Sequence, residues 1–302
     1  SPNPMNNGSY DFYRTGNALG YYGNLDYNTD RHGWFVEVGG RSADFRADTG
    51  FTRRTDTNFA FFYNRISSKS RQDAPIIRAN WAQYVGYDYD WAGRMQRFRT
   101  GSNIGFSLQR SIFVYVEAGA IKEKLYEEEF GLRRMPTRPG RFFGAATREA
   151  WKQFIYSEIS HNLNKHFAYY VGVGYTNNEF DYFFPAGNGQ IDPGPGKHLE
   201  ANAEFEWKPV NAWRASMSYT KSRLVRNDNR IRSFDSDIFS LRSTYSFSRF
   251  VFIRTRLDYD SMQQDYAGQA LFGWTPSPGT AFYAGYNDSF SYKGVNPFSG
   301  QP

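Results

Sequence analysis

The sequence predicts an all-β protein, a transmembrane antiparallel β-barrel of about 16 or more strands when complete. Three observations predict this class: a two-residue alternation of apolar and polar side chains, an even spread of aromatic residues, and connections of alternating length. The alternation is clearest in LEANAEFEWK at 199–208, where odd-numbered positions are apolar and even-numbered positions are polar or charged. Successive side chains of a strand point to opposite faces, so this segment has one apolar and one charged face.

The aromatic residues point to the medium that the apolar faces meet. The chain has 302 residues, including 28 Phe, 23 Tyr and 7 Trp, and these are spread over every segment. A soluble sandwich would gather its bulky apolar residues in one shared core. A transmembrane barrel instead turns them outward along every strand, keeps a polar lumen and carries aromatic girdles at its rims. No stretch approaches the ~20 apolar residues of a membrane helix, which excludes a helical membrane protein.

Period-2 matching places the strands in chain order. In the first third of the chain they are expected at 17–28, 32–42, 45–51, 57–67 and 76–90. After residue 95 they are expected at 96–109, 112–126, 147–162, 166–182, 197–208, 212–225, 236–248, 250–262, 266–275 and 280–292.

The connections after residue 95 alternate in length. Short ones are expected at 109–111, 163–165, 209–211, near Arg249 and at 276–279. Longer ones are expected at 127–146, 183–196 and 226–235, with a brief one at 263–265. Short periplasmic turns and longer external loops are typical of outer-membrane barrels, and so the pattern predicts the bacterial outer membrane as the location.

The same alternation gives the last strand a direction. With a periplasmic turn at 276–279, the strand at 280–292 runs outward, whereas a barrel of this kind finishes with a returning strand. We therefore expect residues 1–302 to be a single outer-membrane barrel domain, and a fragment that lacks the closing strand and any N-terminal periplasmic or surface domain. Residues 1–4, SPNP, do not form a signal peptide.

One local motif resembles a known family. The motif comprises Asp44, Phe45, Asp48, Gly50, Phe51 and Arg54. It is similar to the Asp-Phe-x-x-Asp-x-Gly-Phe-x-x-Arg stretch of an uncharacterised bacterial family, in which a domain of unknown function follows a carbohydrate-binding-module-like domain. FIRTR at 252–256 and YND at 286–288 resemble that family's C-terminal region. The resemblance implies an exported outer-membrane barrel and no established reaction. This chain departs from the family pattern because it lacks the carbohydrate-binding-like domain and the final strand.

The motif cluster and a set of alternating charges are the candidate sites. The motif's Asp and Arg side chains suit a lumen ion-pair network, a cation site or a docking surface, but a turn that holds two strands in register is favoured. The candidate lumen and selectivity residues are Glu204, Glu206, Arg242, Arg254, Arg256 and Asp258. They either set the selectivity of a pore or neutralise one another as a polar filling. The similar numbers of acids and bases favour the filling.

The long loop and two glycines extend these expectations. Loop 127–146 holds three consecutive glutamates and several arginines, which favours a solvated external loop over a lipopolysaccharide or cation contact. Gly172 and Gly174 fall on the lumen side of their strand, where tight packing or a passage needs room.

No catalytic residue, metal site or cofactor is predicted. The chain has no cysteine, no His-Glu-x-x-His and no Gly-x-Ser-x-Gly motif. Its net charge of +6 favours anionic partners, so we expect contact with outer-membrane lipid and lipopolysaccharide, and with envelope proteins or glycans. Nucleic acid is not an expected partner because the bases are scattered among acids.

Three functions remain open from the sequence. The first is a porin-like channel or translocation barrel with a charged lumen. The second is a membrane anchor for a carbohydrate-binding domain or a larger envelope complex, with a plugged lumen. The third is a barrel hydrolase, which we rank last because enzymatic motifs are absent from the sequence.

Overall fold

A computed structural model describes residues 18–45, 55–131 and 134–291, and it is built almost entirely from antiparallel strands. The first half contains β1 (Gly20–Asn28), β2 (His32–Arg41), β3 (Thr57–Ser67), β4 (Ile76–Tyr89), β5 (Met95–Leu108), β6 (Ile112–Tyr126), α1 (Glu127–Phe130) and β7 (Thr147–Asn164). The second half contains β8 (Phe167–Asp181), β9 (Pro185–Gly187), β10 (Gln190–Ile191), β11 (Gly194–Val210), β12 (Trp213–Arg226), β13 (Arg232–Ser246), β14 (Val251–Asp260), β15 (Asp265–Ser277) and β16 (Thr280–Ser291).

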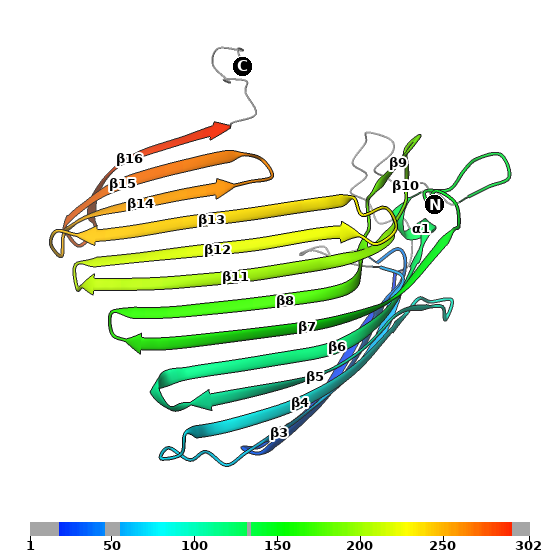
Figure 1. Cartoon of the computed structure of the whole chain (residues 1–302), viewed down its shortest axis with the longest axis horizontal. Helices are drawn as coiled ribbons and strands as arrows, with labels where there is room; N and C mark the ends of the chain where they lie inside the picture. The colour runs from blue at the N-terminus through cyan, green and yellow to red at the C-terminus, as the bar shows by residue number, and fades with distance from the viewer. Residues whose placement is uncertain (1–17, 46–54, 132–133, 292–302) are drawn as a thin grey trace, which may run out of the picture.

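These strands form one up-and-down sheet. In the described residues it has 14 strands in chain order, except that β8 pairs with β11 because β9 and β10 form a small separate sheet. Figure 1 shows the sheet twisting and curving, so that the blue N-terminal strands pass behind β4 to β6. This antiparallel meander with short turns at one end and longer loops at the other is the architecture of outer-membrane β-barrels, which confirms the predicted fold class. We call the two ends the turn end and the loop end.

The predicted strands agree with the observed ones within a few residues at most ends. The expected strand at 45–51 lies almost entirely in 46–54, outside the described residues. Two strands begin earlier than expected. β11 starts at Gly194 because its pairing with β8 continues past a bulge, and β13 starts at Arg232 because it keeps pairing with β12 through Asp235.

The register assigns a different chemistry to each face of the sheet. One cross-strand row, shared by β8 and β11 to β14, comprises Tyr170, Glu204, Ser218, Ser240 and Asp258. The adjacent row on the same strands comprises Tyr169, Phe205, Met217, Leu241 and Leu257. Directly paired residues project to the same face, and a step of one residue reverses the face. We call the polar face the inner face and the apolar face the outer face.

The outer face remains exposed instead of forming a soluble core. Trp207, Leu257 and Trp274 are 46%, 55% and 47% exposed. The buried apolar cluster is small, and none of its members is Leu199, Phe205, Trp213 or Met217. In the described part of the chain no helix has the length and apolar character to span a membrane. An apolar surface spread over so many strands requires an apolar environment.

Gly172 is expected to be essential for packing on the inner face. A Cβ at this position would lie 2.5 Å from Tyr156 Oη and 2.9 Å from Tyr170 Oη. Both hydroxyls donate to Glu158 Oε2, at 3.0 and 3.1 Å. Gly172→Ala should therefore displace both tyrosines and lower the free energy of unfolding by about 1 to 3 kcal/mol, measured by urea unfolding of the refolded chain.

Gly268→Ala is the matched control for that substitution. Its Cβ would lie 3.5 Å from Leu257 Cδ2, which is ordinary van der Waals contact. Equal unfolding midpoints for the two variants would contradict the close packing at Gly172.

Candidate functional site on the inner face

All six predicted lumen residues lie on the inner face. Glu204 and Glu206 are on β11, Arg242 is on β13, and Arg254, Arg256 and Asp258 are on β14. Glu204 belongs to the row that ends at Asp258, through serines on β12 and β13. Glu206 belongs to the next row, which runs through Ser216 to Arg242 and Arg256. The candidates therefore form adjacent rows of one surface.

The cations of β14 have partners on their own strand. Arg256 Nε lies 2.6 Å from Asp258 Oδ2, and the Ser240 hydroxyl donates to the same carboxylate. The guanidinium of Arg254 lies 4.6 Å from the centre of the Phe252 ring. Asp258 thus neutralises Arg256, and Arg254 is held over an aromatic ring.

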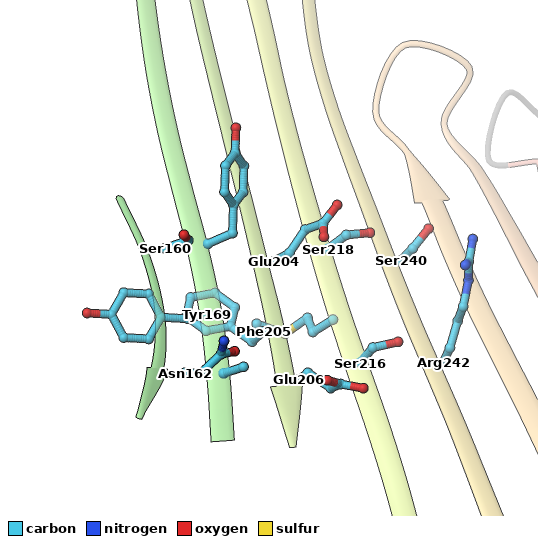
Figure 2. Close-up of a pocket in the computed structure, with 13 residues that line it drawn as sticks. Ser160, Asn162, Tyr169, Glu204, Phe205, Glu206, Ser216, Ser218, Ser240 and Arg242 are labelled. Atoms are coloured by element: carbon cyan, nitrogen blue, oxygen red, sulfur yellow. The ribbon is translucent and has the colours of Figure 1, made fainter. Parts of the chain in front are cut away.

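The remaining candidates are less fully paired. Glu206 forms ion pairs with Lys208 at 3.1 Å and Arg214 at 3.3 Å. Among the described residues, neither Glu204 nor Arg242 has an ion-pair partner. Both side chains line a hollow of about 510 Å³. Figure 2 labels the two residues among those that line it. The acids of β11 and the bases of β13 and β14 therefore lie mainly apart, and Arg256 with Asp258 is the one direct pair among the six.

Tyrosine hydroxyls hold two further carboxylates on the inner face. Tyr84 and Tyr115 donate to the two oxygens of Glu117, both at 2.6 Å. On the neighbouring strand, Tyr156 and Tyr170 both donate to a single oxygen of Glu158, at 3.0 and 3.1 Å. Our sequence reasoning missed this network. The available signal was the Tyr-x-Glu spacing at 115–117 and 156–158, because residues two apart on a strand share a face.

Two loops fold over the inner face at the loop end. We call the described residues 127–131, 134–146 and 182–193 the loop-end plug. Phe142 and Ile191 of the plug form a buried cluster with Leu125 of β6 and Phe180 of β8, and all four are at most 5% exposed. A parallel bridge joins Phe142 to Ile191. Figure 1 shows α1, β9 and β10 at the same end of the sheet. Loop 127–146 is therefore anchored at Glu127, Gly140 and Phe142, whereas most of its other described residues are exposed, which agrees with the expected solvated loop.

Glu127 anchors the buried part of loop 127–146. Glu127 is 1% exposed. Its carboxylate accepts hydrogen bonds from the backbone N–H groups of Arg134 at 3.2 Å and Phe142 at 3.5 Å. The Arg134 guanidinium lies 3.4 Å away. A buried carboxylate is tolerated where hydrogen bonds and a cation replace water, so this glutamate organises the loop around itself.

A buried arginine fastens the plug to β12. Arg226 is 2% exposed. Its guanidinium lies 2.6 Å from Asp228, 3.2 Å from Asp192 and 3.8 Å from Asp181. It also lies 4.3 Å from the centre of the Phe184 ring. Through Asp192 this one cation ties the plug to β12, and it also contacts Asp181 at the end of β8 and Asp228 after β12.

A buried lysine fastens the plug to β7. Lys152 Nζ lies 2.5 Å from Glu123, 2.6 Å from Glu179 and 3.1 Å from the Tyr182 hydroxyl. Burial raises the pKa of Tyr182 to about 12. The hydroxyl therefore stays protonated at neutral pH and donates to Glu123 at 2.9 Å.

The contact between Arg226 and Asp228 should make the β12–β13 loop sensitive to acid. The Arg226 hydrogen bond holds the pKa of Asp228 below its ordinary value of 3.8. A carboxyl with a depressed pKa contributes stability above that ordinary value and loses it as pH falls through the folded pKa. We expect the β12–β13 loop to loosen below about pH 4, measured from the spectrum of a spin label on Asn229→Cys, since the chain has no other cysteine.

Asp228→Asn is the control for this pH effect. The amide cannot ionise, so the label should be mobile at neutral pH and change little on acidification. A label that loosens equally with and without Asp228 would assign the transition to other groups.

One serine–histidine pair occurs at the loop end. His198 Nε2 lies 2.9 Å from Ser222 Oγ, and the His198 ring packs edge-on against Phe234. Within the described residues, Nδ1 of His198 has no hydrogen-bond partner. A nucleophile and a base are thus adjacent without the third group that orients the base in a triad.

The family-motif cluster is described in part. Asp44 lies in a turn that the Phe45 N–H closes by donating to the Ser42 carbonyl at 3.1 Å. The Phe45 ring packs on Gly20, where an added Cβ would lie 2.6 Å from the ring. The other motif residues are Asp48, Gly50, Phe51 and Arg54, and they lie outside the described residues. The role of the cluster stays a prediction.

The fold and the polar inner face together define the class of outer-membrane β-barrels. No family model matches this chain, and no curated protein matches it. Among solved structures, the copper transporter OprC is similar, with 12% identity and a TM-score of 0.44, over 90% of this chain and 55% of that one.

Two receptors from Pseudomonas aeruginosa are also similar to the chain. The siderophore receptor PirA has 11% identity and a TM-score of 0.38, over 90% of this chain and 63% of its own. The ferric enterobactin receptor PfeA has 9% identity and a TM-score of 0.38, over 89% of this chain and 56% of its own. The chain therefore spans less than two thirds of each of these proteins.

Proposed function

We propose that the chain is an outer-membrane transport barrel that passes polar solutes along its charged inner face. The observation that carries this proposal is the division of the sheet into an exposed apolar face and a polar face. On the polar face, charged residues continue across β11 to β14 in the half of the sheet nearer the turn end, away from the plug. A surface of this kind inside a closed barrel provides a water-filled path and sets its selectivity.

The proposal places the loop end outside the cell. The register places four cations of β6, β11 and β12 on the outer face near this end: Lys122, Lys124, Lys197 and Arg223. Trp151 pairs with Lys122 on that face and is 46% exposed. Cations beside an aromatic girdle suit the phosphates of lipopolysaccharide, which remains the expected lipid partner.

The loop-end plug supports a second candidate, a membrane anchor with a closed lumen. Phe142 is fully buried, Arg226 forms an ion pair with Asp192 of the plug, and Lys152 donates a hydrogen bond to the Tyr182 hydroxyl of the plug. In this alternative the barrel holds a carbohydrate-binding domain or an envelope complex at the surface and conducts nothing. The channel is favoured because charged rows continue on the inner face beyond the plug. A membrane anchor with a closed lumen would not require charged residues there.

Single-channel recording in planar bilayers separates the two candidates. The refolded full chain should give discrete conductance steps as a transport barrel. Absence of steps from both the wild type and a variant with a loosened plug would support the anchor and reject transport.

The hydrolase remains a third candidate because of the Ser222–His198 contact. Hydrolysis of a short-chain ester by the refolded chain, abolished in Ser222→Ala, would establish it. Equal rates in the two proteins would remove it.

A further inference from the structure

Three arginines gather around one hollow between β13 and β16. Arg242, Arg254 and Arg256 line a space of about 540 Å³ on the inner face. Its lining also includes Gln269 and Asn287. Among the described residues that form this lining, no side chain is acidic. The hollow therefore has a positive potential, which favours anions over neutral solutes.

The register makes this charge costly for the fold. Arg242 lies directly opposite Arg256 on the neighbouring strand. Like charges in direct cross-strand pairs are destabilising, so packing alone gives no reason for two arginines at these positions. Asp258 compensates Arg256 at 2.6 Å. Arg242 is exposed and has no ion-pair or hydrogen-bond partner in the part of the chain that the structure describes.

The acid nearest to Arg242 along its row does not reach it. Glu206 belongs to that row on β11, and Ser216 of β12 separates the two. Two strand spacings put their backbones about 10 Å apart. Glu206 is already engaged by Lys208 and Arg214. The positive charge of Arg242 is therefore available to a ligand.

The rest of the row supplies neutral donors and space. Arg256 pairs with Gln269, which pairs with Asn287, so two amides continue the row beyond the arginines. In the next row Arg254 is followed by Leu271 and then by Gly285, which has no side chain to fill the hollow. Guanidinium and amide N–H groups around an open floor suit the oxygens of a carboxylate or phosphate.

We propose that this hollow is a binding station for a small oxyanionic solute, of the size of a sugar acid or sugar phosphate, with Arg242 as its main anchor. That this solute is transported rests on the proposed function, whereas its binding in the hollow does not. Arg242 supplies the planar pair of donors, Arg254 and Arg256 supply the field, and Gln269 and Asn287 bind neutral oxygens.

Titration calorimetry of the full chain in detergent micelles tests the station directly. The probes are glucose 6-phosphate and glucuronate, with glucose as the neutral control. We expect both charged sugars to bind and glucose to give no heat. Arg242→Gln should weaken binding about tenfold or more, since a hydrogen bond to a charged group contributes about 1.5 to 3 kcal/mol. Arg242→Lys should fall between, because it keeps the charge and loses the fork.

Arg249→Gln is the matched control. Arg249 lies in the β13–β14 turn with its guanidinium 4.4 Å from the centre of the Phe250 ring, outside the hollow. Its variant should bind as the wild type does. Arg256→Gln changes a second residue that lines the hollow, so the test remains decisive if one of the two variants fails to fold.

The outcomes separate this inference from the proposed function. Binding that depends on Arg242 in a chain without conductance would keep the station and reject transport. Conductance together with equal affinity in the wild type and Arg242→Gln, or equal binding of glucose, would overturn the station and keep transport. Heat from only one of the charged sugars would assign the station to phosphate or to carboxylate.

Discussion

Replacing Lys152 by methionine is expected to lower the free energy of unfolding by about 3 to 5 kcal/mol. The residue is 4% exposed, and its ammonium group is the cation shared by Glu123 and Glu179. Methionine keeps the length of the side chain but leaves two carboxylates close together without a counter-charge. Denaturant unfolding of the refolded barrel, followed by tryptophan fluorescence, measures the loss.

Two further variants identify the cause of that loss. Lys152→Met combined with Glu123→Gln and Glu179→Gln removes the unpaired charges, so it should recover much of the stability. Lys122→Met changes a lysine on the outer face of β6 that is 29% exposed in its pair with Glu149. Exposed pairs contribute at most about 1 kcal/mol, and equal losses at positions 122 and 152 would contradict a buried network.

The alternating faces could be predicted because they follow from the local geometry of a strand. In LEANAEFEWK at 199–208 the period alone separates Phe205 from Glu204, and the register then carries this separation into Met217 and Ser218. The six charged candidates share a face for the same reason. Each strand fixes the faces of its own residues, and pairing with a neighbour extends the assignment across the sheet.

The loop-end plug could not be predicted because its contacts join residues distant in sequence. Phe142 lies in a loop rich in charge, and its burial depends on Ile191 and Leu125, which belong to other segments. Arg226 likewise meets Asp181 and Asp192 through folding of a separate loop. A charged loop and an ion-paired plug have the same composition. Only the burial of Glu127 and Phe142 distinguishes them.

Phe142→Ala is expected to release the plug and to increase ion flow through the barrel. The side chain is fully buried and packs 5.2 Å from the Phe130 ring centre, with the Arg148 guanidinium 5.5 Å from its own ring. Loss of a buried phenylalanine costs about 3 to 5 kcal/mol, which shifts the ratio of open to closed plug about a hundredfold or more. Larger or more frequent conductance steps in planar bilayers are the expected result.

Phe143→Ala separates release of the plug from general damage to the loop. Phe143 is the next residue and is 57% exposed, so its truncation removes much less packing than truncation of the fully buried Phe142. The Phe143 N–H donates to the Ile191 carbonyl at 2.8 Å, a backbone contact that neither substitution removes. A rise in conductance confined to Phe142→Ala assigns gating to the core of the plug. Trypsin cleavage of the loop would show in which variant the plug opens. If only Phe142→Ala is cleaved and both variants conduct equally, the plug opens without uncovering a passage. The barrel would then be an anchor, and the charges of its inner face would be filling.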